Sequence, residues 1–185
     1  MDMMAPFQAF FECCIGSWET ERTYHYLKHQ EVERSHTEFE IVPLSSVIKT
    51  KVLSDNQYEV PSELETLPGF QLSFSTLSEK GEAVSQTLNM LFVPKQTEER
   101  LLVGDYLRDK AYEEAKPMIS QFRFNPETNE LLMTTQYTRV VSADSIQLIN
   151  PGLRIRKIFN YQRPEEGQPL DTMLLVGFGV EQKVN

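Results

Sequence analysis

The sequence predicts an all-β protein, an antiparallel β-barrel of about ten strands that follows a short N-terminal helix. After Gly16 the chain divides into many short runs typical of strands, and the sequences between the runs are typical of turns. A β-sandwich has the same pattern, but a closed barrel is favoured because closure removes exposed edge strands. With 185 residues, no evident linker and no internal repeat, the chain is expected to form one domain over 1–185.

A short helix is expected at 4–15, before the first strand. Its apolar residues recur at a spacing of three or four: Phe7, Phe10, Phe11 and Cys14. This spacing places them on one face of a helix. Pro6 suits the first helical turn and Gly16 suits the end. We expect this helix to act as a lid.

A series of β-type runs follows, and it defines the expected barrel over about 17–182. The runs are 17–28, 36–42, 46–53, 70–77, 85–93, 100–107, 117–124, 130–139, 145–149, 153–161 and 171–182. Turn sequences between them include Asp55-Asn56, Pro68-Gly69, Asn125-Pro126, Ala143-Asp144 and Asn150-Pro151-Gly152. A second short helix is expected near 56–66.

The first run, 17–28, has two different faces. Alternate residues of a strand point in opposite directions. One face therefore carries Trp18, Thr20, Arg22, Tyr24 and Tyr26, and the other carries Glu19, Glu21, Thr23 and His25. The aromatic face with its one cation fits the inner wall of a ligand-binding barrel. Because a buried arginine needs an anion, supplied by the protein or by a ligand, we expect an acidic ligand.

A second cationic segment follows the turn at 150–152. In the run 153–161, alternation places Arg154 and Arg156 on one face. Guanidinium groups bind carboxylates through paired hydrogen bonds, so Arg22 and this pair suit a ligand with two carboxylates. Alternatively, these arginines reach solvent or form ion pairs with nearby Glu and Asp residues.

Composition and charge exclude several classes of function. A net charge of -9 repels phosphate backbones, so nucleic acid is not an expected partner. No apolar run approaches the roughly 18 to 20 residues of a membrane span, so no membrane association is expected. Cys13 and Cys14 are adjacent and unsuited to a disulfide, which favours a reducing compartment such as the cytoplasm.

Metal binding and nucleophilic catalysis are not expected. His25, His29 and His36 do not form a helical metal-binding pair, because four residues of a strand span roughly 13 Å. The nucleophile motif G-x-S-x-G and the phosphate-binding P-loop are missing from the sequence. Adjacent acidic pairs are expected in solvated turns: Glu98-Glu99, Glu113-Glu114 and Glu165-Glu166.

Several of these segments together resemble a known family. Residues 16–25 have the spacing G-x-W-x-x-x-R-x-x-H after a Phe-rich helix, and residues 150–156 read N-P-x-L-R-I-R. This combination resembles the S/U-type phycobiliprotein chromophore lyases, and 102–106 and 131–137 extend the resemblance over most of the chain. The resemblance implies a lipocalin-like β-barrel in a cyanobacterial cytoplasm or a plastid stroma.

The resemblance also implies a substrate. This substrate is a phycobilin, either phycocyanobilin or phycoerythrobilin, and no cofactor is permanently bound. The protein would pass this open-chain tetrapyrrole to a cysteine of a phycobiliprotein β-type subunit, where a thioether forms. The two bilin propionates are the anions that buried arginines need, and aromatic walls suit the pyrrole rings. The expected bilin-binding residues are Arg22, Arg154, Arg156, Trp18, Tyr24 and Tyr26.

The expected catalytic residues are Asp144 and His25. Asp144 best matches an acidic residue of the family, whose carboxylate would hold the bilin protonated and activate its ethylidene group. Alternatively, Asp144 caps a turn. His25 lies opposite Arg22 unless a bulge intervenes, so it contacts the acceptor protein or faces water. Trp18 has a structural alternative too, in which it closes one end of the barrel beneath a stacked arginine.

The sequence departs from the family pattern in places. Trp18 is the one tryptophan, whereas family members often have several. These departures are typical of the U-type branch, whose members resemble partner subunits of an S-type lyase. We therefore expect a heterodimer with such a subunit or a homodimer. Two alternatives remain, a barrel carrier of an amphipathic acid and a non-catalytic assembly partner.

Overall fold

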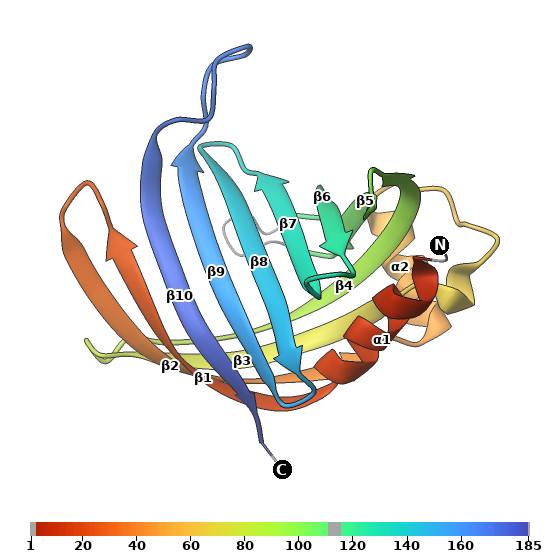
Figure 1. The fold of residues 1–185 in the computed structure, drawn as a ribbon, viewed down its shortest axis with the longest axis horizontal. Coiled ribbons are helices and arrows are strands. Elements are labelled where there is room, and N and C mark those ends of the chain that lie inside the picture. The colour runs from red at the N-terminus through yellow and green to blue at the C-terminus, as the bar shows by residue number, and fades with distance from the viewer. Residues whose placement is uncertain (1–2, 111–115, 185) are drawn as a thin grey trace.

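The computed structural model describes residues 3–110 and 116–184. The elements in these residues are α1 (Met4–Cys14), β1 (Gly16–Tyr26), β2 (Glu31–Pro43), α2 (Ser46–Asp55), the short 3-10 helix η1 (Leu64–Thr66), β3 (Gly69–Ser78), β4 (Ala83–Glu98), β5 (Leu101–Arg108), β6 (Met118–Asn125), β7 (Glu130–Gln136), β8 (Val140–Asn150), β9 (Leu153–Gln162) and β10 (Met173–Lys183). Figure 1 shows a curved sheet with α1 and α2 toward the same end. The acidic pair Glu113-Glu114 lies outside the described residues.

The ten strands of the described ranges form a closed barrel. Each strand from β2 to β9 pairs with the next one along the chain, and β1 completes the ring by pairing with both β2 and β10. The β1–β10 register aligns Trp18 with Lys183 and Tyr26 with Leu175. The predicted antiparallel barrel with a short N-terminal helix is therefore confirmed.

The segment 46–53, predicted as a strand, is instead part of α2. The side chain of Ser45 accepts a hydrogen bond from a backbone N–H three residues later, at 3.5 Å, so it caps the first turn. Val52 then packs with Leu91 and Leu107 in a second apolar cluster outside the barrel. The β-branched residues of the segment indicated a strand, but packing against β4 and β5 favours the helix.

Two further boundaries differ from the prediction. The helix expected near 56–66 is confined to η1, because the longer helix of this region forms earlier, as α2. The turn expected at Ala143-Asp144 does not form, since β8 runs through it. The chain turns earlier, where the Tyr137 N–H donates to the Val140 carbonyl at 2.8 Å. Asp144 is therefore a mid-strand residue and caps no turn.

α1 confirms the predicted N-terminal helix, and its phenylalanines fill part of the barrel interior. Phe7 is fully buried and stacks on Phe122 of β6, with ring centroids 5.2 Å apart. Phe11 contacts Phe70 of β3 at 4.8 Å and Phe92 of β4 at 4.7 Å. The helix therefore packs into the barrel through aromatic contacts with several strands.

β5 passes unusually close to β4 at Gly104. A Cβ atom added there would lie 2.2 Å from the Val93 carbonyl oxygen and 2.7 Å from the Phe122 ring. A glycine is needed because no side chain fits this space. The close approach lets Phe122 occupy the interior beside Phe7.

We predict that Gly104→Ala lowers the free energy of unfolding by about 1–3 kcal/mol, because the extra methyl group overpacks the core. Urea unfolding measures the change. Gly152→Ala is the matched control, since its Cβ would meet Asn150 Oδ1 at a comfortable 3.7 Å. Equal stability of the two variants would contradict the close packing at Gly104.

Candidate functional site

A cavity of about 90 Å³ lies inside the barrel, next to α1. One side of it is formed by α1 residues, namely Phe10, Phe11 and Cys14. The lining from β3 and β4 is largely apolar and includes Phe70 and Phe92, whereas the lining from β8 and β9 includes Asp144, Arg154 and Arg156. The cavity therefore has apolar and charged walls, as binding sites for amphipathic ligands do.

Asp144 and Arg156 form an ion pair on the charged wall. Arg156 Nε donates to Asp144 Oδ1 at 2.9 Å, and Arg156 Nη2 donates to Asp144 Oδ2. This bidentate ion pair between β8 and β9 fixes the orientation of the carboxylate and the guanidinium. Both side chains stay partly accessible, 20% for Asp144 and 11% for Arg156.

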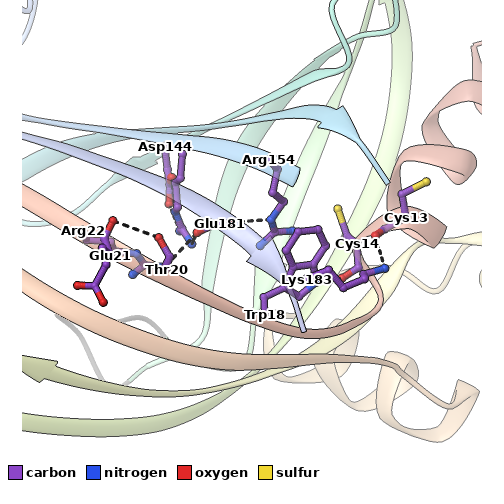
Figure 2. A network of polar contacts seen from close by, with 11 residues as sticks. Cys13, Cys14, Trp18, Thr20, Glu21, Arg22, Asp144, Arg154, Glu181 and Lys183 are labelled. Atoms are coloured by element: carbon purple, nitrogen blue, oxygen red, sulfur yellow. Dashed lines mark hydrogen bonds and ion pairs between the residues drawn. The ribbon is translucent and has the colours of Figure 1, made fainter. Parts of the chain in front are cut away.

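Arg154 stacks on Trp18 beside this pair (Figure 2). The guanidinium carbon lies 4.6 Å from the Trp18 ring centroid and 5.1 Å from that of Phe39. Trp18 is 1% exposed, and its Nε1 donates to the Cys14 carbonyl at 2.9 Å. Trp18 is not among the cavity-lining residues, and through these contacts it connects β1 with β9 and with α1.

Glu181 on β10 lies between the arginines (Figure 2). It accepts hydrogen bonds from Arg154 Nε at 2.6 Å and from Arg22 Nη2 at 3.2 Å, and Arg156 Nη1 lies 4.0 Å away. Glu181 is 0% exposed. Burial by itself raises the pKa of this carboxyl, but the attraction of the three guanidinium groups outweighs it and holds the pKa below its ordinary value. The protein thus supplies its own anion to these arginines.

The sequence contained a signal for Glu181 that the prediction missed. Along β10, alternation places Gly177, Gly179 and Glu181 on the inner face. A Cβ added at Gly179 would lie 3.1 Å from Arg22 Cγ, and one at Gly177 would lie 3.0 Å from the Tyr24 ring. The two glycines therefore leave room for the large inward residues of β1.

Three of the predicted binding residues lie on the inner side of β1, beyond the cavity. Arg22, Tyr24 and Tyr26 are half-buried, and none is among the described residues that line the cavity. Arg22 Nε is buried and has no hydrogen-bond partner in the described part of the chain. Arg22 thus has one donor satisfied by Glu181 and another still available.

His25 lies on the outer face of β1 and is exposed. Its register partners are Val32 of β2 and Val176 of β10. The register is unbroken from Trp18 to Tyr26, so no bulge turns His25 inward. Any role of His25 therefore belongs to the outer surface, away from the cavity.

Arg108 is a further cavity-lining arginine that the sequence analysis did not identify. It is 2% exposed and lies at the end of β5. Alternation along β5 was the available signal, since Leu102, Gly104, Tyr106 and Arg108 share one face. Because this face begins with an apolar residue, it is expected to point into the barrel. Arg108 lies on the same face and therefore points inward as well.

Cys14 lines the cavity, and burial raises the pKa of its thiol despite the opposing effect of Arg154. A protonated thiol is a poor nucleophile, so Cys14 suits packing rather than covalent chemistry. Within 3–110 and 116–184, no group of three or more His, Cys, Asp or Glu residues is placed to bind a metal ion. No helix of the same ranges has the length and apolar character needed to cross a bilayer.

The model of the family described as "CpeS-like protein" matches residues 6–184. The chain belongs to this family. It is 57% identical over 185 residues to Chromophore lyase CpcS/CpeS 1 of Synechococcus sp. (strain JA-3-3Ab), with 100% of both chains covered. Phycocyanobilin lyase subunit CpcS of Picosynechococcus sp. is 19% identical over 156 residues, covering 84% of this chain and 78% of the relative. The resemblance stated from the sequence is thereby confirmed.

A solved structure shares the fold of this CpeS-like chain. It is described as the S-type phycobiliprotein lyase CPES from Guillardia theta, and the superposition has a TM-score of 0.75. The sequence identity is 18%, and the match covers 97% of this chain and 93% of the other. The CpeS-like barrel is therefore conserved in shape where most side chains differ.

We predict that Glu181→Gln lowers the free energy of unfolding of this CpeS-like barrel by about 3–5 kcal/mol, because the buried arginines lose their shared anion. Urea unfolding at neutral pH measures the loss. Glu19→Gln is the control, since Glu19 is exposed on the outer face of the neighbouring β1 and its charge contributes little. A small effect of Glu181→Gln, like that of the control, would refute the central role of Glu181.

We predict that the stability difference between wild type and Glu181→Gln depends on pH. The pKa of Glu181 in the folded state lies below the ordinary value of 4.5, so the unfolded state binds the proton more readily. The stabilisation is fully present above about pH 4.5 and is lost as the pH falls through the folded-state pKa. The stability difference between wild type and Glu181→Gln should therefore shrink on acidification, and a constant difference would exclude the lowered pKa.

Proposed function

We propose that this chain is a phycobilin chromophore lyase, or one subunit of such a lyase. It binds an open-chain tetrapyrrole and assists its thioether attachment to a cysteine of a phycobiliprotein β-type subunit. One observation carries the proposal: the cavity of this CpeS-like barrel combines apolar walls with the oriented pair Asp144–Arg156. The name of the Synechococcus relative, a chromophore lyase, supports the same function.

In this proposal the acceptor protein supplies the nucleophile. The cysteine sulfur adds to the exocyclic ethylidene carbon, the new C–S bond replaces the π bond, and the thiol proton ends on the adjacent ring carbon. Asp144 faces the pyrrole nitrogens and holds their protons, which makes the ethylidene group more electrophilic. Arg156 keeps the Asp144 carboxylate in position. The barrel also orients the bilin and limits side reactions with water.

The arginines of the barrel match the propionates of a bilin. Arg22, Arg154 and Arg156 converge on Glu181, which creates a positive environment suited to a further carboxylate. The buried Nε of Arg22 has no partner in the described residues and offers one donor. We assign one propionate to the side of this cluster formed by Arg22 and Arg156, while Arg154 remains stacked on the tryptophan.

The cavity enlarges when the bilin enters. Binding sites for ligands of drug size or larger hold about 300–1,000 Å³, whereas this cavity holds about 90 Å³. Phe10 and Phe11 of α1 border it and occupy the adjoining space. We therefore infer that α1 moves outward as a lid, while the strands keep their pairing.

The outer surface supports a protein partner. Phe178 and Val180 on the outer face of β10 are 48% and 40% exposed, and we propose that a protein partner covers them. His25 lies nearby on β1 and would belong to the same surface. We propose an S-type lyase subunit, a second copy of the chain or the acceptor β-type subunit as the partner on this surface. We place the protein in a cyanobacterial cytoplasm or a plastid stroma, where acceptors are assembled.

Absorption spectroscopy with phycocyanobilin and with phycoerythrobilin tests the proposed function. We expect a red-shifted complex and, after addition of an acceptor β-type subunit, a chromophore that stays attached on a denaturing gel. If bilin transfer occurs only after an S-type lyase subunit is added, this chain is a partner subunit of that lyase. Fatty-acid binding without any bilin complex would indicate a carrier and overturn the lyase proposal.

We predict that the double variant Arg22→Ala, Arg156→Ala binds phycocyanobilin at least about tenfold more weakly, because charge-assisted hydrogen bonds to a propionate are lost. Absorption titration gives the Kd, and circular dichroism checks the fold. The matched control, Arg123→Ala with Arg139→Ala, removes the same charge from exposed positions. An unchanged Kd in the folded double variant would exclude the assigned propionate site.

We predict that Phe10→Ala speeds phycocyanobilin uptake, because the lid then loses one of its buried anchors. Phe10 is 2% exposed, so the variant also loses about 3–5 kcal/mol of stability. Stopped-flow absorption measures the uptake rate. Phe178→Ala, an exposed phenylalanine outside the barrel, is the control. Uptake by folded Phe10→Ala at the wild-type rate would show that α1 is not a lid.

A further inference from the structure

Arg108 lies at the end of β5, and its buried guanidinium forms part of the cavity wall. Its Nη2 donates to Thr135 Oγ1 and to the Tyr137 hydroxyl, both at 3.2 Å. Its guanidinium carbon lies 5.1 Å from the Tyr106 ring centroid and 5.7 Å from that of Tyr137. Two hydroxyl groups and two aromatic rings therefore orient this guanidinium inside the barrel.

Polar residues connect Arg108 with the ion pair on β8 and β9. Thr135 of β7, which accepts from Arg108, lies directly opposite Ser142 of β8. Ser142 and Asp144 are two residues apart and share one face of that strand. The polar residues that line the cavity include Arg108, Thr135, Tyr137, Ser142, Asp144 and Arg156, beside the stacked Arg154. The lining from β5, β7, β8 and β9 thus carries a series of polar groups beside Leu131, Met133 and Ile146, with an arginine toward each end.

This wall suits a ligand with two separated carboxylates. Burial of polar groups is costly unless hydrogen bonds compensate, and the planar fork of an arginine matches a carboxylate in particular. The walls from β3 and β4 are apolar, as Phe70, Leu72 and Phe92 show. A ligand that is flat and apolar on one side and acidic at two points would therefore contact every part of the lining.

We propose that Arg108 is a second carboxylate-binding site, which holds one bilin propionate while the Arg156 side holds the other. The inference rests on the proposed function, because it requires a dicarboxylic tetrapyrrole. The Tyr137 hydroxyl positions the guanidinium. Two arginines on one wall then fix the orientation of the bilin in the barrel, which single-point attachment would leave free to rotate.

Absorption titrations with phycocyanobilin and with its dimethyl ester test this site. Arg108→Gln should weaken the binding of the free acid roughly 10- to 100-fold, as expected for lost hydrogen bonds to a charged group. The same variant should change the Kd of the dimethyl ester less than about twofold, since the ester has no carboxylate to pair with. Arg123→Gln removes an equal charge from the exposed face of β6 and should alter neither Kd.

The outcomes separate this inference from the proposed function. If wild type binds neither compound, the proposed function itself fails. If wild type binds phycocyanobilin but Arg108→Gln weakens acid and ester equally, or weakens neither, the Arg108 site is refuted. Should Arg108→Gln not fold, Tyr137→Phe removes the positioning hydroxyl at nearly constant volume. Weaker binding of the acid alone by Tyr137→Phe supports the site, and unchanged binding of the acid overturns it.

Discussion

Glu181, on the last strand, accepts hydrogen bonds from Arg154 of β9 and from Arg22 of β1, the first strand. This fully buried carboxylate joins the two ends of the chain at the seam where the barrel closes. Because unpaired buried charges are costly, the arginines and the carboxylate require one another, and the closed β1–β10 pairing brings them together. The stacking of Arg154 on Trp18 depends on this cluster, which Arg156 approaches at 4.0 Å while it pairs with Asp144.

The interior of the barrel is divided between this charged region and an aromatic one. The phenylalanines of α1 pack on Phe70, Phe92 and Phe122, so the helix completes the apolar core on the side where the strands leave space. Such a helix is held by side-chain contacts rather than by strand hydrogen bonds. In the proposed mechanism α1 moves while the strands keep their pairing, which connects the proposed lid with the small cavity.

The chemistry proposed for the site needs little from the barrel beyond placement. The buried Cys14 has a raised pKa and suits packing, so the reacting thiol is assigned to the acceptor protein. The barrel supplies a cavity with apolar walls, a carboxylate held in place by Arg156, and arginines on one side of the cavity. These features act by orientation and electrostatics, and such effects supply a large share of catalysis when the reacting group comes from another molecule.

The run of strands and turns was sufficient to predict the barrel, and alternation along single strands placed Arg154 and Arg156 on one face, because both signals depend on local backbone geometry. The strand prediction failed at 46–53, where packing against β4 and β5 selects a helix for β-branched residues that suit a strand. It also did not reveal the partners inside the barrel. Glu181 meets Arg22 across a separation of 159 residues.

The sequence by itself therefore determined the antiparallel barrel, the N-terminal helix, the family and the placement of Arg154 and Arg156 on one face of a strand. Only the tertiary structure decided that Glu181 pairs with Arg22 and Arg154 and that Asp144 sits mid-strand against Arg156. It alone also brought Arg108 to the same cavity. The physical reason is that the direction of a side chain follows from the local geometry of its strand. The partner of a buried charge, in contrast, lies far away in the chain and is brought near only when the barrel closes.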